Sequence, residues 1–194
     1  MKNNVLADYK NWDYGIVIMK KSCLLGAVCI YIYFAQCANA SLVYTTSNSF
    51  NDIEAFDPVT GQRLLHTTGN CANEMAFGPD GNLYCGTGDI DVIDPKTGTT
   101  IRQIQTLNET TTIAFAPDGS LYATSNSFNE IEVFNPLAGI RLNLFSGNCA
   151  NEMAFGPDGN LYCGTGDIDV LNPSTGAAIR QITTLNETTA IAFS

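Results

Sequence analysis

The chain has 194 residues, of which 45% are hydrophobic and 14% are charged. These values are ordinary for a globular protein and exclude an intrinsically disordered chain. Nine basic residues against 19 acidic ones give a formal net charge of −10 at pH 7, which disfavours binding to nucleic acid or to anionic lipid headgroups.

The first 40 residues predict an export signal. Lys20 and Lys21 stand before an apolar run that extends to Ala35. The sequence Ala38-Asn39-Ala40 follows, with the small-x-small pattern that a signal peptidase cleaves. The apolar run is shorter than the ~20 residues of a membrane-spanning helix, which is the alternative interpretation. We expect a signal peptide at residues 1–40.

Cleavage after Ala40 leaves a mature chain at 41–194, which we expect in the periplasm or outside the cell. If translation begins at Met19 rather than Met1, the leader has the usual length of a signal peptide. Four lysines and two aspartates leave with it, so the mature chain keeps 5 basic and 17 acidic residues, a net charge of −12. We expect no nucleic-acid partner and, after cleavage, no membrane contact.

From Leu42 onward a unit of about 39 residues recurs. Its marker, Phe77-Gly-Pro-Asp-Gly-Asn-Leu-Tyr84, returns in similar form at 115–122 and 155–162. The 24 residues at 69–92 recur unchanged at 147–170, two units later. A period near 40 without a helical pattern predicts β-propeller blades.

Turn residues divide each unit into four short strands. Pro79-Asp80-Gly81 and Asp94-Pro95-Lys96-Thr97-Gly98 mark reversals in the second unit, because proline fixes φ at the entry to a turn and glycine takes the positive φ that closes it. The strands expected there are 74–77, 83–86, 90–93 and 101–107. We therefore predict an all-β fold, a β-propeller of about four four-stranded antiparallel blades.

The motif F-x-P-D-G-x-L-Y followed by I-x-V-x-D-P-x-T-G resembles the extracytoplasmic propellers of the NHL, YVTN and streptogramin-lyase-like group, which includes SMP-30-like proteins. The resemblance covers residues 42–193 and implies a propeller within the wider WD40-like superfamily. Members of the group include lyases, lactonases, quinoprotein relatives and binding scaffolds, so the resemblance implies no single reaction.

The two ends of the mature chain complement each other. Ser41-Leu42-Val43-Tyr44 matches the second strand of a blade, whereas Ile191-Ala192-Phe193-Ser194 matches the first strand. Pairing of these segments would close a ring and leave no open edge. A fragment of a longer propeller and a homodimer that completes a larger ring are the two alternatives.

The residue inventory limits the catalytic classes. A streptogramin-lyase-like mechanism needs a histidine base, but the single histidine, His66, lies in an irregular outer segment with no counterpart in other units. No G-x-S-x-G elbow, phosphate loop, C-x-x-C pair or H-E-x-x-H helix occurs. The lactonase relatives, as the resemblance implies, hold a divalent metal with glutamate, asparagine and aspartate at the channel mouth.

Four glutamates are the candidate metal ligands. Glu74 and Glu152 stand three residues before Phe77 and Phe155, and Glu109 and Glu187 precede the alternate inner strands. Oxygen ligands of this kind suit Ca²⁺ or Mg²⁺. Solvated acidic loops are the alternative interpretation.

Asp89-Ile90-Asp91 and its copy at 167–169 alternate along a strand, so both carboxylates share one face. We interpret that face as solvated.

Removal of the leader leaves four cysteines, Cys71, Cys85, Cys149 and Cys163, in a chain sent to an oxidising compartment. Pairing of Cys71 with Cys85, and of Cys149 with Cys163, keeps each bridge inside one copied unit. In a tight hairpin Cys85 lies opposite Met75, so 69–73 must fold back to bring the cysteines together. Four free, packed thiols are the alternative.

The leading hypothesis is a non-enzymatic exported propeller that binds a protein, a cell-envelope component or a small ligand through its loop face, with no cofactor expected. A metal-dependent hydrolase or lyase of the lactonase type, with Ca²⁺ or Mg²⁺, is the rival hypothesis.

Overall fold

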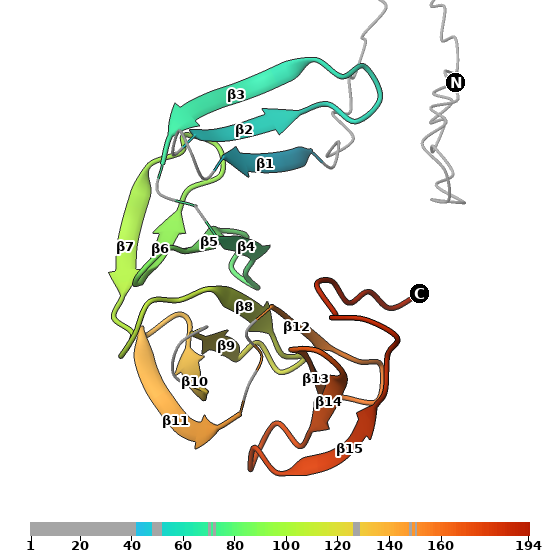
Figure 1. Ribbon diagram of the computed structural model, residues 1–194. Coiled ribbons are helices and arrows are strands. Elements are labelled where there is room, and N and C mark those ends of the chain that lie inside the picture. The colour runs from blue at the N-terminus through green and yellow to red at the C-terminus, as the bar shows by residue number, and fades with distance from the viewer. Residues whose placement is uncertain are drawn as a thin grey trace, which may run out of the picture. The chain divides into compact units, whose positions relative to one another are not determined.

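The computed structural model describes residues 42–47, 52–69, 71, 73–125, 129–147, 149 and 151–194. The predicted signal peptide lies outside these residues. Leu42–Ser194 forms one compact unit, in which the described residues make fifteen β-strands and no helix (Figure 1). No helix in this described part could span a membrane.

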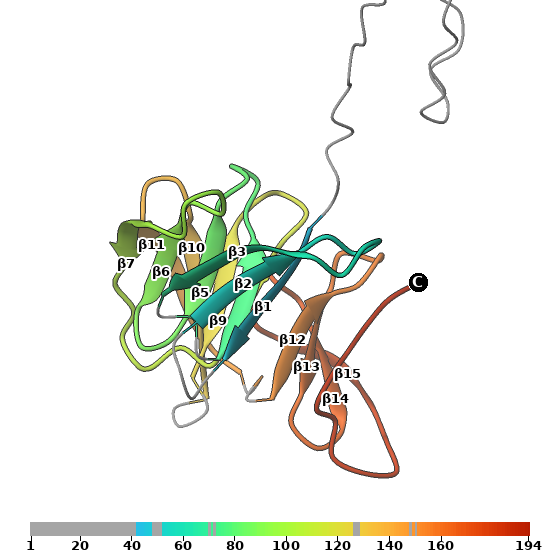
Figure 2. The same cartoon turned by 90° about the horizontal axis from the view of Figure 1, so that it is seen from above.

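The strands form four antiparallel sheets that follow one another in chain order (Figures 1 and 2). The first sheet has three strands, β1 (Val43–Ser47), β2 (Asp52–Phe56) and β3 (Arg63–Thr68). The second has β4 (Glu74–Phe77), β5 (Leu83–Gly86), β6 (Ile90–Ile93) and β7 (Thr100–Ile104). The third has β8 (Thr112–Phe115), β9 (Leu121–Thr124), β10 (Glu130–Asn135) and β11 (Ile140–Ser146). The fourth has β12 (Glu152–Phe155), β13 (Leu161–Gly164), β14 (Ile168–Leu171) and β15 (Ala178–Ile182). The predicted fold class, an all-β propeller of four-stranded blades, is confirmed, and we call these sheets blades one to four.

The predicted turns close the hairpins. In blade two, Phe77 pairs with Leu83 across the turn. Gly81 adopts φ +78° there, and Gly98 adopts φ +71° in the turn between β6 and β7. A left-handed backbone of this kind favours glycine, because a Cβ atom would clash with the following carbonyl.

The outer strand of blade two is shorter than predicted. It ends at Ile104 rather than at Leu107. The amide of Thr106 donates to Oδ1 of Asp89 at 2.9 Å, so a side chain accepts the backbone donor that a longer strand would use.

His66, predicted to lie in an irregular segment, belongs to the regular strand β3 and is 3.4 Å from the carboxylate of Asp52.

Each pair of neighbouring blades shares an apolar cluster. The tyrosine in the second strand of a blade meets the phenylalanine at the end of the next inner strand, edge to face. The ring pairs are Tyr44 with Phe77, Tyr84 with Phe115 and Tyr122 with Phe155, each with centroids 5.0 Å apart. The repeated F-x-P-D-G-x-L-Y motif therefore fixes how the blades stack.

The predicted pairing of the chain's two end segments is not made in this structure. The strand β1 has only β2 as a neighbour among the described strands. Ile191-Ala192-Phe193-Ser194 forms no strand. Among the described residues, the first blade therefore has no inner strand like those of the other three blades.

Candidate functional site

The loop face is the end of the blades at which the inner strands begin. In blade two, Glu74 pairs with Gly86 and Ile90 pairs with Ile104, so the start of β4 and the β5–β6 hairpin lie at the same end. Blade four repeats this arrangement with Glu152 and Gly164. The loops that lead into β4, β8 and β12 therefore share one face.

Glu74 and Glu152 begin the inner strands of blades two and four, and their carboxylates interact. Burial, followed by the charge of Glu152, raises the pKa of Glu74 to about 6. Burial also raises the pKa of Glu152, although its Oε1 accepts a hydrogen bond from the Met153 amide at 3.2 Å. Two half-buried carboxylates near each other favour a proton or a cationic group between them.

The other two predicted glutamates have different surroundings. Oε1 of Glu187 accepts a hydrogen bond from the amide of Asn151 at 2.8 Å, and Glu109 is exposed. Within the described ranges, no three or more carboxylate, histidine or cysteine side chains gather into a group that could hold a metal. Ca²⁺ takes 6–8 oxygen ligands, so the Glu74–Glu152 pair alone does not fit such a site. The four-glutamate metal site stays a prediction.

Two asparagines that the sequence did not single out fix the loop face. The side-chain amide of Asn73 donates to the carbonyl oxygen of Thr110 at 3.0 Å, which ties blade two to the loop before β8. Asn151 makes the equivalent bond to Thr188 at 3.3 Å. Their place beside Glu74 and Glu152 in the copied 24-residue stretch is the signal that could have pointed to them.

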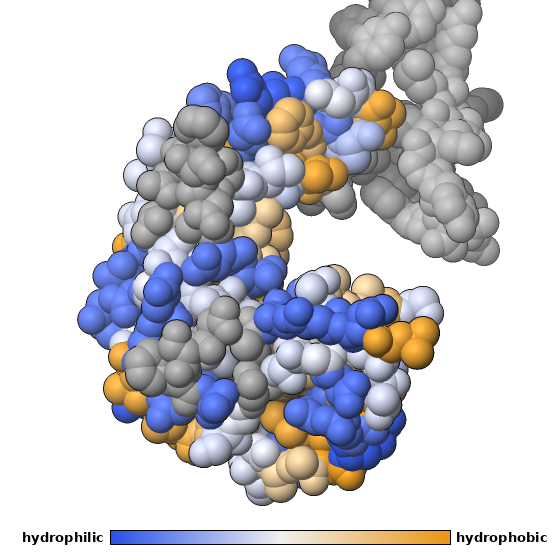
Figure 3. Space-filling view, viewed as in Figure 1, coloured by the Kyte–Doolittle hydropathy of each residue, from blue (hydrophilic) through white to orange (hydrophobic). Residues whose placement is uncertain are grey.

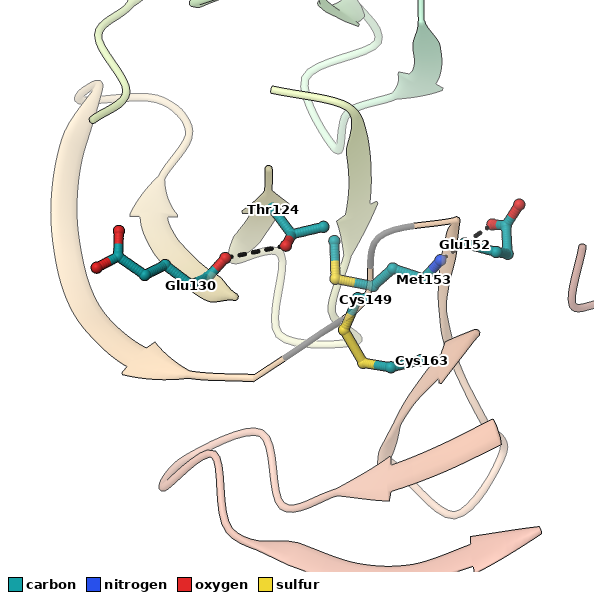
Figure 4. The surroundings of a disulfide bond; sticks show 6 residues. All are labelled: Thr124, Glu130, Cys149, Glu152, Met153 and Cys163. Atoms are coloured by element: carbon teal, nitrogen blue, oxygen red, sulfur yellow. Dashed lines mark hydrogen bonds between the residues drawn. A yellow bond between two sulfur atoms is a disulfide. The ribbon is translucent and has the colours of Figure 1, made fainter. Parts of the chain in front are cut away.

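Two disulfides anchor the same loops. Cys71 is bonded to Cys85, with Cα atoms 4.7 Å apart. Cys149 is bonded to Cys163, with Cα atoms 4.4 Å apart, and Figure 4 shows this second bridge. This is the local pairing. The Asn73 amide donates to the Gly86 carbonyl at 3.2 Å, so the backbone stays beside β5 as it approaches the bridge. Asn70 and Ala72 of the predicted fold-back lie outside the described residues.

The interpretation of Asp89 and Asp91 as a solvated face is wrong. Asp89 accepts hydrogen bonds from the Thr106 amide at 2.9 Å and from the Gln105 side chain at 2.7 Å. Asp91 is only 6% exposed and accepts a hydrogen bond from Gln103 at 3.1 Å. Burial raises the pKa of Asp91. These carboxylates stabilise the edge of the blade because they satisfy its donors.

Glu132 is a carboxylate that the sequence did not single out. Its side chain is 8% exposed and lies 2.8 Å from the guanidinium of Arg141. Its other oxygen, Oε1, accepts the amide of Leu107 at 2.9 Å, across the boundary between blades two and three. Glu132 therefore joins two blades as well as two strands.

The face of the molecule in Figure 3 is largely hydrophilic, with small separate hydrophobic areas. No protein-family model matches the chain, and no curated protein matches it. Among solved structures, 642 chains match, so the fold is widespread. One is a chain of hydrazine synthase from Kuenenia stuttgartiensis, with 18% sequence identity and a TM-score of 0.63. The match covers 74% of this chain and 46% of that chain, and at this identity the likeness shows the propeller-like fold alone.

Proposed function

We propose that this protein is an exported, non-enzymatic binding scaffold whose loop face takes a cationic group of a protein, an envelope component or a small ligand. The observation that carries the proposal is the pairing of Glu74 with Glu152 at the starts of two inner strands, where the charge of one raises the pKa of the other. A bound cation would relieve this repulsion.

Described residues next to both glutamates are held in place by covalent or hydrogen bonds. A disulfide holds the approach to each glutamate, and an asparagine amide holds the next loop. Residues that are already held in this way lose little conformational entropy when a ligand binds. The net charge of −10 attracts cationic partners from a distance, and it does so less at high salt. The two disulfides also suit an oxidising compartment outside the cytoplasm.

The experiment measures the affinity of a short oligolysine peptide for the full chain by isothermal titration calorimetry at two salt concentrations. Glu74→Gln removes one charge from the loop face, and Asp118→Asn removes one from the β8–β9 turn at the other end of a blade. We expect E74Q to weaken binding about tenfold, the effect of losing one close charge pair, and D118N to leave it unchanged.

Equal weakening by E74Q and D118N would mean that the peptide responds only to net charge, and it would overturn the proposal. Peptide binding that neither E74Q nor Glu152→Gln weakens would also overturn the proposal.

A further inference from the structure

The first blade has an open inner edge. Its strand β1 pairs only with β2 among the described strands. In blade three the corresponding strand, β9, pairs on its other side with the inner strand β8. An unpaired edge of this kind exposes a row of backbone donors and acceptors that a further strand would satisfy.

A segment with the sequence of an inner strand lies unpaired near the other end of the unit. Ala190-Ile191-Ala192-Phe193 repeats Thr112-Ile113-Ala114-Phe115, which forms β8. The ring of Phe193 lies 4.9 Å from that of Tyr162, edge to face, just as Phe115 lies 5.0 Å from Tyr84. The segment thus occupies the place of an inner strand against blade four but has no sheet to join.

The boundary between blades two and three shows what the missing contact requires. Eight buried residues form its apolar cluster: Tyr84, Ile90, Val92, Ile104, Ile113, Leu121, Ala123 and Phe134. Two polar contacts flank it. Leu107 donates its amide to Glu132 at 2.9 Å, and the side chain of Asn108 donates to Glu130 at 3.2 Å.

Copies of several of these residues, 78 positions away, are more exposed. Leu121 is 0% exposed, whereas its copy in blade one, Val43, is 48% exposed. Leu107 is 52% exposed, and its copy in blade four, Leu185, is 100% exposed. The same contrast holds for the buried Ile90, Ile104, Ile113 and Phe134 against the half-buried Ile168, Ile182, Ile191 and Phe56.

The polar partners are copied as well. Glu54 corresponds to Glu132 and already holds Arg63 at 2.7 Å, as Glu132 holds Arg141. The other oxygen of Glu132, Oε1, accepts the amide of Leu107, and Oε2 of Glu54 is the equivalent oxygen. Asp52 corresponds to Glu130, and Asn186 corresponds to Asn108. Blade one therefore presents the surface of blade three, and blade four presents that of blade two.

We propose that blade four of one copy docks on blade one of a second copy and that 190–193 becomes the inner strand beside β1. The register follows from β8 and β9, in which Ile113 lies opposite Ala123. It places Ile191 opposite Thr45 and Phe193 opposite Val43. The amide of Leu185 donates to Glu54 across this boundary.

A second copy supplies both missing surfaces at once. Within one chain the two surfaces remain exposed, although every other blade boundary is packed. A pair of copies joined head to tail uses each surface and pairs the inner edge of each first blade.

Cysteine cross-linking between two variants of the full chain tests the register. Thr45→Cys and Ile191→Cys are prepared separately and then mixed under mild oxidation. Residues directly opposite in antiparallel strands have Cβ atoms about 4.5–5.5 Å apart, close enough for bridging. We expect a covalent dimer from the mixture and none from either variant alone. Thr45→Cys mixed with Ala192→Cys is the control, because Ala192 points to the opposite face of the strand.

The double variant T45C/I191C distinguishes a second copy from closure within one chain. We expect it to run as a dimer without reductant. A bridge inside a single chain, or no bridge in any mixture, would overturn the proposal.

A matched pair of substitutions tests the interface without added cysteines. Glu54→Ala should convert a species of two-chain mass, measured by light scattering, to one-chain mass, with its melting temperature changed little. Glu132→Ala should keep the two-chain mass and lower the melting temperature, because Glu132 joins blades of the same chain. A one-chain mass for the unsubstituted protein would contradict the inference.

Discussion

The carboxylate of Glu152 raises the pKa of Glu74, although the two residues begin inner strands of different blades. The inner strand β8 contacts both β4 and β12, so it brings the two strand starts toward each other. Residues 78 positions apart in a repeated sequence thereby become electrostatic neighbours.

This relationship predicts a pH-dependent stability. The pKa of Glu74 rises from 4.5 to about 6 on folding, so the folded protein holds this proton more tightly than the unfolded chain does. Stability is therefore lost as the pH rises through that window. Glu74→Gln should stabilise the protein at about pH 7 by up to ~1 kcal/mol, a value reduced for solvent screening, and should have no effect below about pH 4.

Thermal denaturation across the pH range checks this expectation, with Glu109→Gln as a control that removes an exposed charge from the same face. A gain in stability that E74Q retains at low pH would show that the amide acts by packing rather than by charge.

Loss of a disulfide should destabilise the fold substantially. Each bridge spans 14 residues in the sequence, and closure of a loop of that size contributes about 3 kcal/mol. We expect Cys71→Ser/Cys85→Ser and Cys149→Ser/Cys163→Ser each to lower the free energy of unfolding by about this amount, measured in urea. Peptide mapping without reductant should recover the two local bridges, whereas a Cys85–Cys163 peptide would contradict them.

Asp89 should prove structural. Its side chain accepts the Thr106 amide at 2.9 Å, and Asp167 accepts the Thr184 amide at the same distance in blade four. Replacement of either aspartate by alanine leaves a backbone donor unpaired and should cost about 1–3 kcal/mol. Urea unfolding of both variants measures the cost. A negligible effect would restore the interpretation of a solvated face.

Two turn glycines separate the free-energy cost of a steric clash from the cost of a strained backbone. Gly81 and Gly98 both have positive φ. A Cβ atom added at Gly98 would lie 2.0 Å from Cγ2 of Thr67, whereas a Cβ atom added at Gly81 would have no atom within 4 Å. Gly81→Ala should cost about 1–2 kcal/mol, and Gly98→Ala should cost more. Equal melting temperatures for the two variants would show that the Thr67 side chain simply moves aside.

Calcium tests the four-glutamate prediction directly. A ligand that binds only the folded state raises the melting temperature by mass action. Because no three acidic, histidine or cysteine side chains of the described residues gather into a group, we expect about 1 mM Ca²⁺ to leave the melting temperature unchanged. A rise that E74Q abolishes would instead show that a cation gathers further ligands.

The sequence by itself determined the blades, because their signals are local. Pro79-Asp80-Gly81 and its copies set each hairpin through the φ angles of proline and glycine, and the strict spacing of Phe77 and Tyr84 repeats the contact between blades. The 14-residue spacing of the cysteines favoured local bridges for the same reason. A repeat of fixed period therefore indicates the architecture from the sequence alone.

Tertiary structure alone decided which polar groups meet. Asp91 looked like part of a solvated strand face, yet neighbouring strands bury it against Gln103. Glu132 gave no motif, but it receives an amide from another blade. The four glutamates looked equivalent in sequence, but the structure brings the charge of Glu152 close enough to Glu74 to raise its pKa. Alternation along a strand predicts the face on which a side chain lies, but burial depends on what packs against that face, which residues distant in the chain determine.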